Sequence, residues 1–229
     1  MIQINNLYKS YDNLKIFEDF NLKIDNGQII CLLGPSGCGK TTLLNILSGI
    51  ENYDKGNITG ISDSFSYIFQ ETRLLPWLTI EDNIKFVLKS NNNLEITDIV
   101  NRYLDVVQLS EYKNYYPSQL SGGMKQRVSI ARAFAYESDI LLMDEPFKGL
   151  DYELKKKLIN AFLSLWKYDN RTVLFVTHDI DEAILISDII YILDGRPVKV
   201  KNRLKIDIPR EERNTEDKEF IELKNIILS

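Results

Sequence analysis

A glycine-rich segment that ends in a lysine and a threonine is the part of this sequence with the clearest chemistry. Its eight residues fit the pattern G-x-x-x-x-G-K-[ST] and are Gly34, Pro35, Ser36, Gly37, Cys38, Gly39, Lys40 and Thr41. Glycines let the backbone curl so that several N–H groups point at phosphate oxygens. We expect Lys40 to reach the β- and γ-phosphates of a nucleotide, the Thr41 hydroxyl to ligate Mg²⁺, and Thr42 also to touch phosphate.

The flanks of this phosphate loop have the pattern that such a loop requires. Residues 29–33 form a short apolar run typical of a buried strand, and residues 41–50 have the apolar spacing of a helix. A turn that merely joins a strand to a helix could carry the same letters, but few chance matches also have both flanks.

An acidic pair follows a second apolar run, residues 140–143. At the tip of a strand, Asp144 can hold Mg²⁺ through its water shell. Glu145 would point to a different side, where it can orient or deprotonate an attacking water. The alternative is that the pair only caps a turn before Pro146; the preceding apolar strand and the phosphate loop favour a role in hydrolysis.

The elements that must position these residues alternate along the chain. In the first part of the chain, strands are predicted over 2–7, 20–24, 28–33 and 64–69 and around residue 58. A helical stretch follows over 81–137. The last part alternates, with strands at 140–143, 173–177 and 189–193 separated by helices at 152–166 and 180–186. This alternation indicates a parallel sheet covered by helices, with ligands at the carboxyl ends of its strands. We expect one α/β domain, with a catalytic core at about 1–80 and 138–229 and a helical subdomain at about 81–137.

Four further segments resemble the motifs of the ABC ATPase family. They are Leu120-Ser121-Gly122-Gly123-Met124-Lys125-Gln126-Arg127 for its signature, Phe69-Gln70-Glu71 for its Q-loop, Gly149-Leu150-Asp151 for its D-loop and Val176-Thr177-His178-Asp179 for its H-loop. Their order matches as well, and the resemblance covers essentially the whole chain. It implies a P-loop NTPase core with an N-terminal antiparallel β part, an inserted helical subdomain, and ATP as the ligand.

The signature has a physical meaning of its own. Ser121, Gly122 and Gly123 precede a predicted helix, so they could bind an anion or simply cap that helix with a flexible glycine pair; the residues alone leave both open. The resemblance implies that two copies pack head to tail as a homodimer when ATP is bound. Each ATP would lie between the phosphate loop of one copy and the signature of the other.

Further roles follow from the resemblance, residue by residue. Tyr11 would stack on adenine, although a strand aromatic packed in the core is the alternative. Gln70 would contact Mg²⁺ or the attacking water, and His178 would contact the γ-phosphate and steady Glu145. Asp151 would cross the dimer interface, near Lys148, which stands where many relatives have a small residue.

The segment from Phe69 to Thr79 is similar to the nitrate, sulfonate and taurine import subfamily, as are Glu145-Pro146-Phe147 and the tail with Pro209-Arg210 and a short helix near 220–227. This similarity implies a subunit on the inner face of the cell membrane. It would couple ATP-driven closure to transport through integral membrane permease subunits, with an extracytoplasmic solute-binding protein as an indirect partner.

Three apolar residues within that segment have two open interpretations. Leu74, Leu75 and Trp77 could pack under the helical part, or they could form a groove that receives a helix of a membrane subunit.

The bulk properties limit other functions. The net charge of −5 and the pI near 5.1 argue against a nucleic-acid partner. Cys31 and Cys38 are not spaced as a metal pair, and we expect neither a secretion signal nor a membrane span. A soluble ABC ATPase of DNA repair or translation is the main alternative, but the long coiled coil or second cassette typical of those is not apparent. A small-molecule kinase and a scaffold without turnover are weaker alternatives, because of the signature and His178.

Overall fold

The computed structural model describes residues 1–61, 64–88 and 93–228, with only the backbone of residues 93 and 94. The chain forms two compact units. The first unit contains Met1–Asp63, Leu142–Glu145 and Arg171–Ser229, and the second contains Ser64–Leu141 and Pro146–Asn170. The helical subdomain expected over 81–137 falls within the second unit, and its boundaries stay a prediction; residues 89–92 of it lie outside the described residues.

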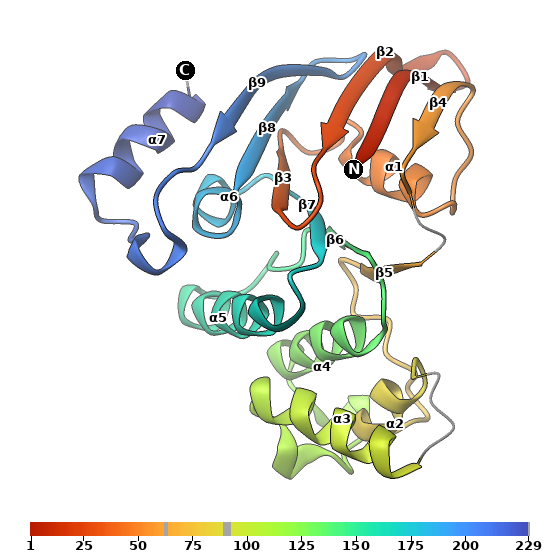
Figure 1. Cartoon of the computed structure of the whole chain (residues 1–229), viewed down its shortest axis with the longest axis vertical. Helices are drawn as coiled ribbons and strands as arrows, with labels where there is room; N and C mark the ends of the chain where they lie inside the picture. The colour runs from red at the N-terminus through yellow and green to blue at the C-terminus, as the bar shows by residue number, and fades with distance from the viewer. Residues whose placement is uncertain (62–63, 89–92, 229) are drawn as a thin grey trace. The chain divides into compact units, whose positions relative to one another are not determined.

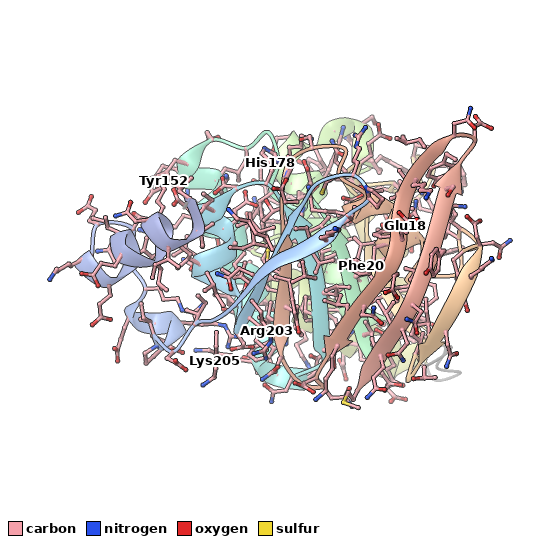
Figure 2. The ribbon with its side chains drawn as sticks, turned by 90° about the horizontal axis from the view of Figure 1, so that it is seen from above. Glu18, Phe20, Tyr152, His178, Arg203 and Lys205 are labelled. Atoms are coloured by element: carbon pink, nitrogen blue, oxygen red, sulfur yellow. The ribbon has the colours of Figure 1, made fainter. Side chains whose placement is uncertain are left out.

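An antiparallel sheet opens the first unit. It has the strand order β2-β1-β4, built from β1 (Ile2–Tyr11), β2 (Leu14–Ile24) and β4 (Lys55–Thr59). Alternate residues are buried over 2–4 of β1 and 20–24 of β2, and register shifts interrupt the alternation between these strands elsewhere. On β2, for example, Phe20 faces inward while Glu18 is exposed (Figure 2). The antiparallel β part expected at the N-terminus is therefore confirmed.

A second sheet of the first unit carries the strand ends predicted to bear chemistry. Its strands follow the order β6-β7-β3-β8-β9, with β3 (Ile29–Leu33) parallel to β7 (Thr172–Thr177) and β8 (Ile189–Asp194). Residues 142–144 are the part of β6 (Ile140–Asp144) that belongs to this unit. Every residue of β3 and β7 is buried, because helices and chain cover both faces of a parallel sheet.

The sheet ends in an antiparallel strand that the sequence pattern does not predict. β9 (Lys199–Lys205) pairs with β8, and four of its seven residues are basic, so apolar alternation is absent. Arg203 and Lys205 lie on this strand (Figure 2). Charged residues of this kind are common on sheet edges, where they discourage pairing with other chains.

In its described residues, the first unit also has a 3₁₀ turn at Arg210–Glu212 and three α-helices (Figure 1). They are α1 (Lys40–Leu47), α6 (Ile180–Ile186) and α7 (Lys218–Leu228), and α7 packs against α6. α1 follows β3 through the phosphate loop and buries Leu43 and Leu44. It ends three residues before the predicted residue 50, because Gly49 adopts a left-handed conformation with φ of 68°.

The second unit is mainly helical. Its elements are β5 (Phe65–Ile68), the first two residues of β6, α2 (Ile80–Lys85), α3 (Asn93–Val106), α4 (Gly122–Ala135) and α5 (Tyr152–Asp169), with short 3₁₀ turns at Ser110–Tyr112 and Pro117–Gln119. α4 contacts α2, α3 and α5 (Figure 1). The rings of Phe134 and Phe147 both pack against Phe162 in its core. In the described parts of the chain, no helix is long and apolar enough to span a bilayer.

Candidate active site

The phosphate loop lies between β3 and α1, as its pattern predicts. Gly37 and Gly39 have φ angles of 75° and 115°, which residues with a side chain rarely adopt. Gly39 is the residue before α1, and it provides no side chain to accept the first N–H groups of the helix. Those N–H groups and the positive end of the helix dipole are therefore available to an anion.

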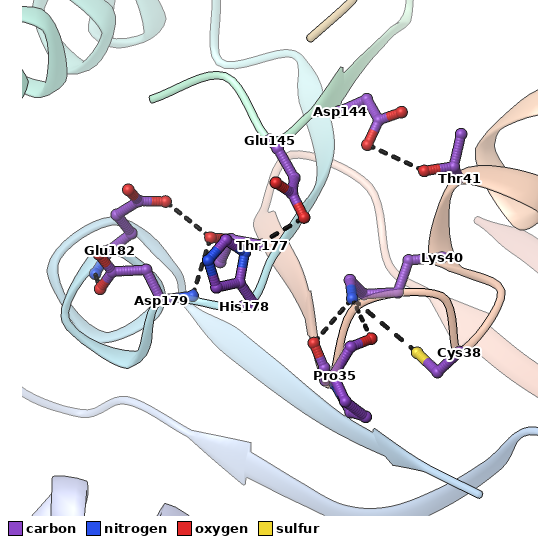
Figure 3. A network of polar contacts seen from close by, with 11 residues as sticks. Pro35, Cys38, Lys40, Thr41, Asp144, Glu145, Thr177, His178, Asp179 and Glu182 are labelled. Atoms are coloured by element: carbon purple, nitrogen blue, oxygen red, sulfur yellow. Dashed lines mark hydrogen bonds and ion pairs between the residues drawn. The ribbon is translucent and has the colours of Figure 1, made fainter. Parts of the chain in front are cut away.

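The side chain of Lys40, the first residue of α1, folds back into this loop. Its Nζ donates to the carbonyls of Gly34 and Pro35 at 2.7 and 2.9 Å, with Cys38 Sγ at 3.9 Å (Figure 3). The residue is only 5% exposed. A buried ammonium group whose nearest partners are neutral carbonyls is better compensated by an anion. A phosphate group fits that requirement.

A hydroxyl and a carboxylate meet beside the loop. Thr41 Oγ1 donates to Asp144 Oδ1 at 3.2 Å, which joins the first turn of α1 to the end of β6 (Figure 3). Mg²⁺ binds oxygen ligands at about 2.0–2.1 Å in octahedral geometry, which places neighbouring ligands about 3 Å apart. Mg²⁺ usually takes one or two protein ligands and fills the rest with phosphate and water. The pair thus fits the ion, directly or through water.

Glu145 and His178 form the second polar pair of the site. Glu145 Oε1 lies 3.2 Å from His178 Nδ1, with 10% of the glutamate side chain exposed and 47% of the histidine side chain (Figure 3). Glu145 has a φ of 43° and donates its N–H to Val176 O at 3.0 Å. A glutamate rarely adopts this left-handed conformation, and such backbone strain concentrates at functional sites.

The backbone around His178 is held by a small buried network. Thr177 Oγ1 donates to Glu182 Oε2 at 2.7 Å and accepts from Asp179 N at 3.1 Å (Figure 3). The Asp179 carboxylate caps α6 by accepting from the N–H groups of Asp181 and Glu182. Sequence reasoning missed Glu182; its only signal is a carboxylate in the first turn of the helix after the histidine.

Tyr11 ends β1 near the phosphate loop. The residue is 42% exposed, so it is not packed in the core, and Lys9 Nζ lies 4.7 Å from the ring centroid. Burial raises the pKa of the phenol, a hydrogen bond with Glu51 raises it further, and one with Thr42 lowers it. The contact with Thr42 places the ring beside the phosphate loop, where adenine stacking stays a prediction.

The signature residues lie in the second unit, at the start of α4. Ser121 Oγ accepts from Met124 N at 3.3 Å, so Ser121 caps α4, as one of the two interpretations of the signature predicts. A Cβ added to Gly123 would come within 2.5 Å of Leu154 Cδ2, whereas one added to Gly122 meets nothing within 4 Å. Gly123 therefore packs closely against the Leu154 side chain of α5, and Gly122 faces open space. Binding of phosphate at this helix start stays a prediction.

Gln70 and Asp151 also belong to the second unit. Gln70 is exposed in the segment after β5. Asp151 caps α5, since its Oδ1 accepts from Leu154 N at 3.0 Å, and it follows Gly149, whose φ is 74°. The structure therefore brings together the phosphate loop, Tyr11, Asp144, Glu145 and His178 in the first unit. Gln70, Ser121–Gly123 and Asp151 lie in the second.

A phosphate loop before a helix, a Thr–Asp pair suited to Mg²⁺ and a Glu–His pair define a P-loop nucleotide-binding protein. Comparison with known proteins names the family: the ABC transporter family matches residues 17–148. The chain therefore belongs to the family of ABC transporter ATP-binding proteins, and it is an ABC ATPase.

Similar sequences cover nearly the whole chain. An uncharacterized ABC transporter ATP-binding protein of Methanocaldococcus jannaschii is 36% identical over 100% of this chain and 90% of its own length. The aliphatic sulfonates import ATP-binding protein SsuB of Bacillus cereus (strain ZK / E33L) is 36% identical over 99% of this chain and 94% of its own length. The nitrate import ATP-binding protein NrtD of a Synechocystis species is 35% identical over 89% of this chain and 80% of its own length.

Solved structures agree with this family. The dimeric post-hydrolysis state of the ATP-binding cassette MJ0796 bound to ADP and Pi has a TM-score of 0.78 and 28% identity. It covers 91% of this chain, and all of that cassette is matched. The predicted fold, a P-loop core of the ABC ATPase type, is therefore confirmed.

Proposed function

We propose that this ABC ATPase is the Mg-ATP-hydrolysing subunit of an importer, and that two copies close on ATP to drive transport through separate membrane subunits. The observation that carries the proposal is the contact of Glu145 Oε1 with His178 Nδ1, 3.2 Å apart, in the same compact unit as the phosphate loop. A scaffold that only binds nucleotide has no need of this pair.

The described residues divide the work of hydrolysis. Lys40 and the N–H groups at the start of α1 would bind the β- and γ-phosphates. Thr41 and Asp144 would hold Mg²⁺, which when bound would supply positive charge to the phosphate oxygens. Glu145 orients the attacking water and draws its proton. His178, hydrogen-bonded to Glu145, fixes the direction of that carboxylate and contacts the γ-phosphate.

The second phosphate surface is supplied by the other copy of a homodimer. Ser121 and the open Gly122 begin α4, and a helix start of this composition favours an anion. Dimeric cassettes among the similar structures support this arrangement. Gln70 would report the γ-phosphate or Mg²⁺, and Asp151 would lie at the seam.

Contact with membrane subunits is proposed for the loop of residues 72–79 and its surroundings. Trp77 and Phe86 are 70% and 69% exposed, which is unusual for side chains of this size. The loop itself is held firmly: Asn83 Nδ2 donates to Leu75 O, Leu78 O and Thr79 O, and Arg132 donates to the carbonyls of Thr72 and Arg73.

A rigid loop with an exposed tryptophan suits a helix of a permease subunit better than internal packing alone. Leu74 and Leu75 are half-buried, so they can pack within the unit and also contact a permease helix. The protein would then sit on the inner face of the membrane, and an extracytoplasmic solute-binding protein would deliver the solute.

The solute would be small, of the nitrate, sulfonate or taurine type. Relatives named for sulfonate and nitrate import match this chain over most of its length. The comparisons do not favour a role in DNA repair or translation. Since the solute is read by other subunits, its identity has to be tested in the assembled transporter.

ATP hydrolysis by the purified chain tests the proposed function. Release of phosphate should require Mg²⁺ and should fall at least about 100-fold in Glu145→Gln, in line with the loss of a general base. Glu153→Gln, an acid in the first turn of α5, is the matched control and should keep full activity. Equal hydrolysis by Glu145→Gln and the unchanged chain would refute the assignment.

A further inference from the structure

The carboxyl end of α6, the helix that follows His178, is gripped by two arginines from the C-terminal part of the chain. Arg213 Nη1 donates to Ile184 O at 2.8 Å, Leu185 O at 3.2 Å and Ser187 O at 2.8 Å. Arg210 Nε donates to Ile186 O at 2.8 Å. We call Arg210 and Arg213 the arginine brace.

The brace supplies what this helix end lacks. The last carbonyls of a helix have no partner within the helix and carry the negative end of its dipole. Five-donor guanidinium groups satisfy both needs, and Arg213 Nε also donates to Ile208 O at 2.9 Å, which anchors the side chain in its own segment. Burial lowers the pKa of Arg213 to about 10, so the group remains charged at neutral pH.

The brace also reaches the strand that leads into the phosphate loop. Arg210 Nη2 forms a 2.5 Å ion pair with Asp188 Oδ1, and both side chains are half-buried. Asp188 Oδ2 in turn accepts from Ile29 N at 2.8 Å, at the first residue of β3. The carboxyl end of α6 is thus tied to the base of the sheet.

The same C-terminal part touches the other end of α6. Lys224 of α7 pairs with Asp181 Oδ1 at 2.6 Å, in the first turn of α6. Figure 1 shows α7 beside α6, and the two helices are in contact. α6 has only seven residues, and it has a C-terminal partner at each end.

Movement of α6 is transmitted directly to His178. Glu182 of α6 accepts from Thr177 Oγ1, which in turn accepts from Asp179 N, so the residues on both sides of His178 are bound into this network. A shift of α6 would therefore change the angle at which His178 meets Glu145. Loss of alignment by a fraction of an ångström is enough to slow a chemical step.

We propose that the arginine brace positions His178 against Glu145 by fixing α6, so that Arg213 and Arg210 are positioning residues for hydrolysis although neither touches the nucleotide. This inference rests on the proposed function, and it adds a role for the C-terminal part of the chain. Arg213 acts on the rate of hydrolysis rather than on ATP affinity, because its hydrogen bonds go to the end of α6 and to Ile208 and not to β3 or the phosphate loop.

The test compares Arg213→Gln with a matched control, Arg203→Gln. Arg203 lies on β9, where it donates to the Tyr191 hydroxyl rather than to α6 (Figure 2). Arg213→Gln should lower kcat about 10-fold with KM for ATP changed less than about 2-fold, as expected for misalignment. Arg213→Lys, which keeps a charge at the helix end, should restore part of kcat. Arg203→Gln should leave kcat unchanged.

A spectroscopic readout separates positioning from general loss of structure. His178 is the chain's single histidine, so the untagged protein labelled at histidine gives one set of imidazole resonances. These should shift or broaden in Arg213→Gln and stay in place in Arg203→Gln. In a His178→Ala background, Arg213→Gln should lower the residual kcat by less than about 2-fold, because coupled residues are not additive.

The proposal is overturned if Arg213→Gln lowers kcat equally with and without His178. It is also overturned if Arg213→Gln leaves both kcat and the His178 resonances unchanged. If Arg213→Gln does not fold, Arg210→Gln, at the other arginine of the brace, replaces it, again with Arg203→Gln as control. The same shift of the His178 resonances is then expected, and its absence overturns the proposal. A wild-type chain without ATPase activity would instead refute the proposed function.

Discussion

Lys40 Nζ lies 2.7 Å from the carbonyl oxygen of Gly34, inside the phosphate loop. The ammonium group lies within the loop, where we expect phosphate to bind. The neutral carbonyls that surround it are replaceable partners, because a charged phosphate oxygen makes a stronger hydrogen bond.

Lys40→Ala should lose ATP binding. A hydrogen bond to a charged group contributes about 1.5–3 kcal/mol, so affinity should fall roughly 10- to 100-fold or more. Equilibrium binding of a fluorescent ATP analogue measures this change. Lys205→Ala, at an exposed pair with Asp207, is the control and should bind normally. Unchanged affinity in Lys40→Ala would remove the loop from the site.

Asp144→Asn should change the requirement for Mg²⁺. The amide retains an oxygen next to Thr41 Oγ1 but loses the charge that attracts the ion. We expect the Mg²⁺ concentration that gives half-maximal hydrolysis to rise at least about 10-fold, since an ionised ligand is replaced by a neutral one. Chelation with EDTA should stop hydrolysis in the unchanged protein. An Mg²⁺ titration that is identical for both proteins would contradict this metal site.

The two signature glycines should behave differently when each is replaced by alanine. Gly123→Ala brings a Cβ to within 2.5 Å of Leu154 Cδ2, and because this is the end of a half-buried side chain that can rotate away, the free energy of unfolding should fall by no more than about 1 kcal/mol. Gly122→Ala meets nothing in the chain, so stability should be nearly unchanged while hydrolysis falls. Urea unfolding and ATPase assays measure the two effects. If Gly122→Ala hydrolyses ATP normally, close approach of phosphate at this helix start is refuted.

Trp77→Ala should uncouple the protein from its membrane subunits without harming the isolated enzyme. The side chain is mostly exposed, so its removal should change stability by less than about 0.5 kcal/mol. Co-purification with the permease subunits should fall sharply. Tyr168→Ala, an even more exposed aromatic residue on α5, is the control. Normal assembly of Trp77→Ala would move the permease contact elsewhere.

The sequence predicts most of the first unit because its signals are local. β3 and the phosphate loop carry both the apolar pattern and the chemistry, and the antiparallel strands alternate over residues 2–4 and 20–24. β9 escaped prediction because an edge strand needs no apolar face, and α1 was expected to end too late because Gly49 terminates it.

Contacts between distant segments were beyond sequence reasoning. Glu182 faces Thr177 only once α6 has folded back on β7, and Arg213 reaches α6 from 26 to 29 residues away. Arg132 and Asn83 hold the loop of residues 72–79 in a similar way. Neither motifs nor periodicity predict such pairings, because the position of a polar residue in the sequence does not indicate which distant residue it will contact.

The most direct test of the account is the oligomeric state of Glu145→Gln with saturating Mg-ATP, measured by size-exclusion chromatography with light scattering. Without hydrolysis, ATP should stay bound between two copies, so the variant should elute as a dimer, and adding Ser121→Arg should return it to a monomer that still binds ATP. A Glu145→Gln protein that remains monomeric with ATP bound would contradict the two-copy site.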